Sequence, residues 1–168
     1  MKTAKITLYK QTILDDVNAV TFKRVDGILA GESEQVKNAL SSDSEEHLDR
    51  HILHGFLESR DANIRKRLTF CIRKDSEELS VSNKLEIDEP SLIYDLLVPE
   101  SFDAQRLKVL ARKMHIYIVQ GIIYDWYAMQ NMKGNVSEED LKDLEAEVVY
   151  MLRSSSVKRP LQPFGPRN

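Results

Sequence analysis

The chain has 168 residues, of which 42% are hydrophobic and 30% are charged, and its formal net charge is −3 at pH 7. This balance excludes an intrinsically disordered chain, and the small acidic net charge argues against a general nucleic-acid binder, which would have a basic excess. The length fits a single domain that buries about two thirds of the surface of its unfolded chain. The lone cysteine, Cys71, excludes an internal disulfide and suits a reducing cytoplasm.

The sequence shows no targeting or membrane segment. The N-terminal residues have neither a long apolar core nor a small-residue cleavage site, so no signal peptide is predicted. The longest apolar run, residues 116–123, is interrupted by Gln120 and is too short to span a membrane. We therefore expect a soluble protein of the cytoplasm with no membrane partner.

Two segments have the alternating pattern of β-strands. Ala4, Ile6 and Leu8 alternate with polar residues, which predicts a short strand at residues 3–10 with one buried face. Apolar residues again alternate with serines and charged residues within residues 79–98. We expect an antiparallel hairpin or small sheet there, which the N-terminal strand could join.

The remaining pattern is mainly helical. Thr12 is expected to cap a helix that stops at Gly31, and residues 32–42 form a short helix at best. A second long helix is expected to run from Asp43 to about Lys74. Its core stripe consists of Leu53, Phe56, Leu57, Ile64, Leu68 and Cys71.

Residues 101–132 are predicted to form the central helix. The second half of this segment is apolar on nearly every side, which is typical of a helix buried against several neighbours at once. Ser101 is the expected N-cap. The main apolar stripe consists of Leu107, Leu110, Met114, Ile118, Gly121, Ile122, Asp125, Trp126 and Met129, with Asp125 as its one charged member.

A last helix is expected to begin at Ser137, with Asp140 completing a capping box, and its acidic residues are expected to face away from the core. Its apolar stripe consists of Leu141, Leu144, Val148, Met151 and Leu152.

From residue 154 onward the sequence SSSVKRPLQPFGPRN has three prolines, three basic residues and no acid, which predicts an extended arm that is mobile unless bound. We therefore expect one helical domain with a minor β element at residues 1–153 and an arm at residues 154–168. The interaction residues expected on this arm are Lys158, Arg159, Pro160, Leu161 and Phe164.

The spacing of three histidines raises the possibility of a metal site. His47, His51 and His54 would fall within an arc of about 60° on a helix, Glu58 continues the row, and imidazoles one turn apart can bind zinc. However, the row lies opposite the predicted core stripe and so should face solvent. The glutamate that serves as general base in zinc-protease helices is also missing, because Leu48 follows His47. A solvated face or subunit contact is favoured, and no metal or cofactor is expected.

Two further residues could in principle do chemistry. Cys71 lies beside Arg73 and Lys74, which could activate a thiol, but a buried structural cysteine is favoured. Asp125 lies in the apolar helix beside Trp126 and must be paired or protonated, so a structural partner such as an arginine is favoured over catalysis. The chain has no phosphate-binding glycine loop, CxxC or GxSxG motif, and we expect no enzyme.

A basic stretch within the second long helix could contact nucleic acid through phosphates. It consists of Arg60, Arg65, Lys66, Arg67, Arg73 and Lys74. No aromatic residues alternate with these side chains to stack on bases. A solvated helix face or a salt-bridged subunit contact is therefore favoured, and nucleic acid is not the expected partner.

Three segments together resemble a known family: residues 99–103 (PESFD), residues 114–127 (MHIYIVQGIIYDWY) and residues 158–164 (KRPLQPF). They are similar to small uncharacterised proteins of Bacteroides-type prophages and mobile elements. The resemblance implies a phage structural protein of the head–tail connector or head-completion class, in which small helical subunits form rings and extended arms reach neighbouring subunits. It also implies self-association or contact with other phage structural proteins, a location in the cytoplasm or the virion, and no catalytic residues.

The combined expectation is a mainly α protein, with a bundle of four or five helices around the central helix and a small antiparallel β element, that acts as a non-enzymatic assembly subunit. In a ring, the acidic last helix and the basic stretch could form the two different faces that meet. The alternative is a soluble interaction or regulatory module of a mobile element that contacts DNA through the basic stretch. A metal-dependent enzyme built on the histidine row is the third possibility.

Overall fold

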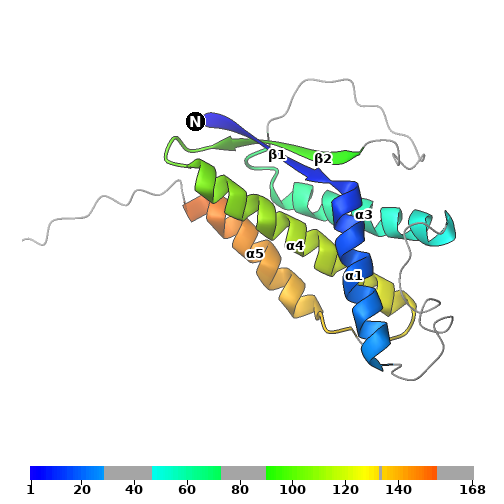
Figure 1. Cartoon of the computed structure of the whole chain (residues 1–168). Helices are drawn as coiled ribbons and strands as arrows, with labels where there is room; N and C mark the ends of the chain where they lie inside the picture. The colour runs from blue at the N-terminus through cyan, green and yellow to red at the C-terminus, as the bar shows by residue number, and fades with distance from the viewer. Residues whose placement is uncertain (29–46, 73–89, 133, 155–168) are drawn as a thin grey trace, which may run out of the picture.

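The computed structural model describes residues 1–28, 47–72, 90–132 and 134–154. Within these residues the chain forms two strands and four helices (Figure 1). They are β1 (Lys2–Tyr9), α1 (Lys10–Ile28), α3 (His47–Arg67), β2 (Ser91–Val98), α4 (Ala104–Met129) and α5 (Glu138–Ser154). The prediction of a mainly helical fold with a small antiparallel sheet is confirmed. The expectations for residues 32–42, for the helix start at Asp43 and for residues 155–168 lie outside the described residues.

Helix α4 lies at the centre of the described structure, where it contacts α1, α3, α5 and β1 (Figure 1). Its buried residues are Leu110, Met114, Tyr117, Ile118, Val119, Gly121, Ile122, Ile123, Trp126 and Tyr127. Because Tyr117, Ile118 and Val119 are consecutive and all buried, this part of the helix is covered on more than one side, as the sequence predicts. Each large apolar side chain buried in this way contributes about 1.5–3 kcal/mol relative to an exposed one.

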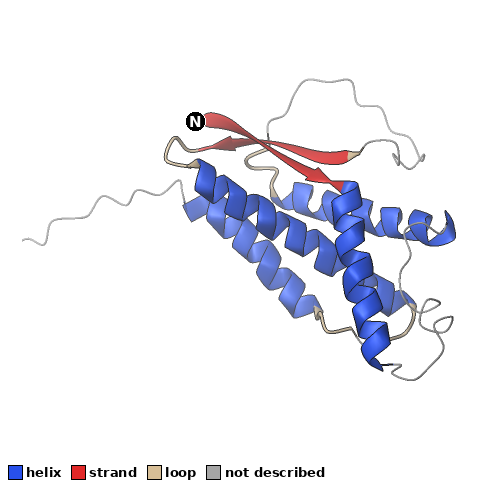
Figure 2. Cartoon of the chain, in the orientation of Figure 1, coloured by secondary structure: helices blue, strands red, loops and turns tan. Residues whose placement is uncertain are grey.

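The two strands form an antiparallel sheet that lies across the helices (Figure 2). The pairing runs from Lys2 opposite Val98 to Tyr9 opposite Ser91. Side chains alternate across the sheet, and its buried face consists of Ile6, Leu8, Leu92, Tyr94, Leu96 and Val98. The predicted N-terminal strand is confirmed, and it pairs with the last part of the predicted 79–98 segment. Residues 79–89 lie outside the described residues.

Two helix boundaries differ from the prediction because strand contacts compete with helical ones. Helix α1 begins at Lys10 rather than after a cap at Thr12, since β1 runs directly into it and the Lys10 backbone N–H donates to the Pro90 carbonyl at 3.0 Å. Helix α3 ends at Arg67 rather than near Lys74. Beyond it, the Cys71 carbonyl accepts from the Leu97 N–H at 2.6 Å, which draws the chain toward β2.

The caps of the last two helices also test the prediction. Asp103, not Ser101, is the N-cap of α4, and its carboxylate accepts from the Arg106 N–H at 2.7 Å. An ionised carboxylate accepts this bond more strongly than a hydroxyl, and its charge favours the helix N-terminus. The capping box of α5 is confirmed: Ser137 Oγ accepts from the Asp140 N–H at 3.1 Å, and Asp140 Oδ2 accepts from the Ser137 N–H at 2.8 Å.

The apolar stripe of α5 is confirmed, with Leu141, Val148 and Leu152 buried against the core. The expectation that all acidic residues of this helix face away is wrong for Glu145. Its side chain is only 16% exposed and forms an ion pair with Arg67 at the end of α3. The contact arises because α3 and α5 both pack on α4, and sequence spacing alone does not reveal it.

A bidentate ion pair connects α3 to α4. Arg60 donates from Nε to Asp125 Oδ2 at 2.8 Å and from Nη2 to Asp125 Oδ1 at 2.5 Å. The side chains are 15% and 22% exposed, respectively, so each charge needs the other. The predicted structural partner for Asp125 is thus confirmed and is an arginine. Gly121 makes the approach possible, because a Cβ at that position would lie 2.6 Å from Arg60 Cδ.

We expect Gly121→Ala to lower the free energy of unfolding by about 1–2 kcal/mol, measured by urea denaturation followed by circular dichroism. The added methyl group displaces Arg60 from Asp125, and this loss exceeds the gain in helix propensity. Gly55→Ala in α3 is the matched control. No atom lies within 4 Å of a Cβ there, so this variant should be as stable as the parent or more stable by up to about 1 kcal/mol. Equal stability changes in the two variants would contradict this account.

Candidate functional site

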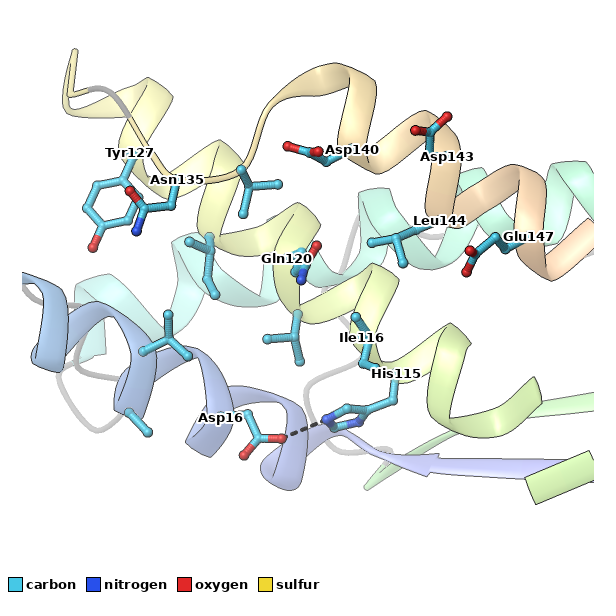
Figure 3. Close-up of a pocket in the computed structure, with 15 residues that line it drawn as sticks. Asp16, His115, Ile116, Gln120, Tyr127, Asn135, Asp140, Asp143, Leu144 and Glu147 are labelled. Carbon is cyan, nitrogen blue, oxygen red and sulfur yellow. Dashed lines mark hydrogen bonds and ion pairs between the residues drawn. The ribbon is translucent and has the colours of Figure 1, made fainter. Parts of the chain in front are cut away.

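A groove of about 1110 Å³ runs along α4 between α1 and α5 (Figure 3). Helix α4 supplies its floor, α1 and α5 supply its two walls, and the loop between α4 and α5 lies at one end. The lining residues divide into an apolar floor and a charged rim.

The floor of the groove is apolar. Ile116, Val119 and Ile123 lie on one face of α4 because they are three and four residues apart. The α1 wall adds Val20, which is 46% exposed, and the α5 wall adds the half-buried Leu144. Val119 and Ile123 are almost covered, at 7% and 4% exposed, so the accessible apolar surface of the groove comes mainly from the half-buried Ile116 and from the two walls. Accessible apolar surface inside a groove is typical of a binding site for another apolar group.

The rim of the groove is acidic. Asp16 stands on the α1 side, and Asp140, Asp143 and Glu147 follow one another along the same face of α5 (Figure 3). Hydrogen bonds from the side chain and backbone of Ser137 lower the pKa of Asp140, so this carboxylate is ionised throughout the neutral range. Charge of one sign around an apolar floor favours partners of the opposite sign.

Basic side chains balance part of this rim. Asp16 Oδ2 lies 2.7 Å from His115 Nε2 of α4, and Lys113 forms an ion pair with Glu147. Asp143 is exposed and has no basic partner among the described residues. The rim therefore keeps an excess of negative charge, with Asp143 the carboxylate most available to an incoming cation.

Two of the three histidines in the row, His51 and His54, have described side chains. His51 is exposed but His54 is buried, with 4% of its surface exposed, so the expectation that the row faces solvent is wrong for His54. The side chain of His47 lies outside the described residues. Among the side chains that are described, no three His, Cys, Asp or Glu residues come close enough together to hold a metal ion. Glu58, one turn after His54 on the same helix, is half-buried.

Cys71 is buried as the sequence suggests. Its thiol lies 3.3 Å from the Leu68 carbonyl oxygen and donates to it, and burial raises the pKa of this thiol to about 11. A thiol with so high a pKa contains almost no thiolate at neutral pH and is a poor nucleophile. The structure therefore favours the structural reading over the reactive one.

The basic stretch is largely neutralised within the chain. Arg60 pairs with Asp125 and Arg67 pairs with Glu145, while Arg65 Nε donates to Asp61 Oδ2 at 2.7 Å. Among its described members, Lys66 alone has no carboxylate partner, and Arg73 and Lys74 lie outside the described residues. The internal pairs weaken the expectation that this stretch offers a free basic face to a second subunit or to DNA.

Asp61 also anchors the sheet to α3. It accepts a hydrogen bond from the Tyr94 hydroxyl at 2.5 Å, and the Arg65 guanidinium lies 4.5 Å from the centre of the Tyr94 ring. Burial, with the nearby Asp61 carboxylate, raises the pKa of Tyr94, so the hydroxyl remains a donor. These groups fix β2 on α3 and serve the fold rather than a site.

Comparison of the chain with models of known protein families, with curated proteins and with solved structures finds no match in any of the three. None of the helices in the described part of the chain combines the length and the apolarity needed to cross a membrane.

Sequence reasoning did not find the groove. Its three sides come from α1, α4 and α5, and which faces of these helices stay uncovered depends on how they pack. One signal was present: Asp140, Asp143 and Glu147 have the spacing of a continuous helix face. It indicates an acidic face but not the apolar floor beside it.

Burial of His54 predicts a pH-dependent stability. Desolvation, followed by the charges of Lys10, Arg50 and His51, lowers the pKa of His54 below its ordinary value of 6.5. The neutral form therefore stabilises the fold fully above about pH 6.5, and this contribution falls as the pH drops toward the lower folded-state pKa. We expect His54→Gln to flatten the fall of the unfolding free energy over that range, measured by urea denaturation at several pH values.

The control for this experiment is His51→Gln on the exposed side of the same helix. This variant removes only the smallest of the causes named for His54, so it should change the pH profile much less than His54→Gln does. If His54→Gln leaves the profile unchanged, His54 is already free to take up its proton in the folded state.

Proposed function

We propose that the protein is a non-enzymatic assembly subunit that self-associates, of the kind found as head–tail connector or head-completion proteins in phages and prophages. The observation that supports this proposal is the groove between α1 and α5, with its apolar floor and acidic rim. A groove of this composition suits a segment of protein chain that inserts apolar side chains and places positive charges at the edges.

A second exposed apolar surface lies on a different part of the molecule. On the outer face of the sheet, Tyr9 is 61% exposed, Ile93 41% and Leu97 37%. Open assemblies and rings require two different surfaces on each subunit, because the contact is head-to-tail rather than two-fold symmetric. The groove and the outer sheet face are two such surfaces, and they are formed by different elements of the fold.

The alternative, a regulatory module that contacts DNA, receives less support. It relies on the basic stretch, whose Arg60, Arg65 and Arg67 already pair with carboxylates of the same chain. A protein that binds duplex DNA through phosphates should show affinity that falls steeply with salt concentration. We expect no such salt-sensitive binding to duplex DNA from the purified protein.

The direct test of assembly is multi-angle light scattering on the full-length chain over a wide concentration range. We expect a defined oligomer that dissociates on dilution and shifts to smaller species when the chain ends at Arg153. The shortened chain keeps nearly all of α5, and circular dichroism would show that its helical content is unchanged. A full-length protein that stays monomeric at the highest concentration reached would contradict the proposal.

A further inference from the structure

The C-terminal segment, residues 155–168, has the chemistry that complements the groove. It contains basic and apolar residues and no acidic ones, whereas the groove has an apolar floor and an acidic rim. We propose that residues 155–168 of one copy bind in the groove between α1 and α5 of a neighbouring copy. The inference rests on the proposed function, because it names the surfaces through which the copies assemble.

Charge complementarity selects this segment. Lys158, Arg159 and Arg167 are its charged residues. On the rim, Asp143 offers a carboxylate with no basic partner among the described residues, and Glu147 lies one turn further along α5. Exposed ion pairs of this kind add little affinity, but they orient the incoming chain and exclude acidic segments.

The apolar residues of the segment match the length of the floor. Leu161 and Phe164 are three residues apart in a proline-rich sequence, and a polyproline II chain turns once every three residues with a rise of about 3.1 Å. The two side chains would therefore lie on one side of the bound chain, about 9 Å apart. Ile116 and Ile123 are seven residues apart on α4, or about 10 Å along the helix axis. The two spacings are therefore similar, which would let both apolar side chains of the segment meet the floor at the same time.

The direction of the chain favours binding between copies. The groove lies alongside α5 at Asp140 to Glu147, while the chain leaves that helix at Ser154, beyond the groove and pointing away from it. To reach its own groove, the segment would have to reverse within a few residues, and Arg159 is restricted to extended conformations because Pro160 follows it. A segment from a neighbouring copy enters without that reversal. Each copy then gives one arm and accepts one, which produces rings or filaments.

Two full-length variants test the inference. In the groove variant, Gln120→Trp fills the middle of the groove, where the half-buried Gln120 lies (Figure 3). In the arm variant, Leu161→Asp with Phe164→Asp removes the apolar groups and adds charges that the rim repels. We expect each variant alone to lose self-association in light scattering. An equimolar mixture should form a 1:1 heterodimer and nothing larger, because one intact groove and one intact arm remain.

Matched control substitutions distinguish a loss of docking from a loss of folding. Gln105→Trp, on the exposed first turn of α4, should assemble as the parent protein does. Asp143→Lys on the rim should raise the dissociation constant by about tenfold or less, whereas Glu139→Lys, exposed on α5 outside the groove, should leave it unchanged. Circular dichroism of every variant identifies any that fails to fold.

The outcomes distinguish this inference from the proposed function. A parent protein that does not assemble contradicts the function itself. A parent protein that assembles while the Gln120→Trp or arm variant assembles equally well overturns the docking alone. Loss of assembly in both variants without a heterodimer on mixing also overturns it, because the arm and the groove would then contact other partners rather than each other.

Discussion

Helix α4 is apolar around so much of its circumference that no single neighbour can cover it, and this constraint organises the described structure. Consecutive residues Tyr117, Ile118 and Val119 are all buried, which requires cover from several directions. Helices α1, α3 and α5 and strand β1 provide that cover. The one charge on the buried side, Asp125, is tolerated because Arg60 reaches it across Gly121.

The same packing produces the groove. Helices α1 and α5 approach α4 from two sides and almost cover Val119 and Ile123, whereas Ile116 stays half-buried and lines the groove between them (Figure 3). The part of the groove surface that stays accessible, at Ile116, Val20 and Leu144, is available to another chain. An apolar surface of this kind is stabilised by association, which is the physical reason for proposing assembly rather than catalysis.

Charge is distributed in a way that supports the proposal. Arg60, Arg65 and Arg67 of α3 pair with carboxylates of the same chain, namely Asp125, Asp61 and Glu145, so these arginines stabilise the fold rather than offer free charge. The carboxylates on the groove rim are only partly balanced, and the C-terminal segment has basic residues but no acidic ones. The unbalanced negative charge of the groove rim and the positive charge of the C-terminal segment are thus complementary, although the net charge of the whole chain is small.

The sequence by itself determined the helical class, the central position of α4, the strand at the N-terminus and the capping box of α5. Each of these features depends on the spacing of residues or on the amount of apolar surface within one segment. The periodicity of the sequence is enough to predict such features. The tertiary structure decided where α3 ends, which residue caps α4, that His54 is buried, that Glu145 pairs with Arg67, and that a groove lies between α1 and α5. These features depend on groups brought together from distant segments, and a one-dimensional pattern contains neither their distances nor the faces that packing leaves uncovered.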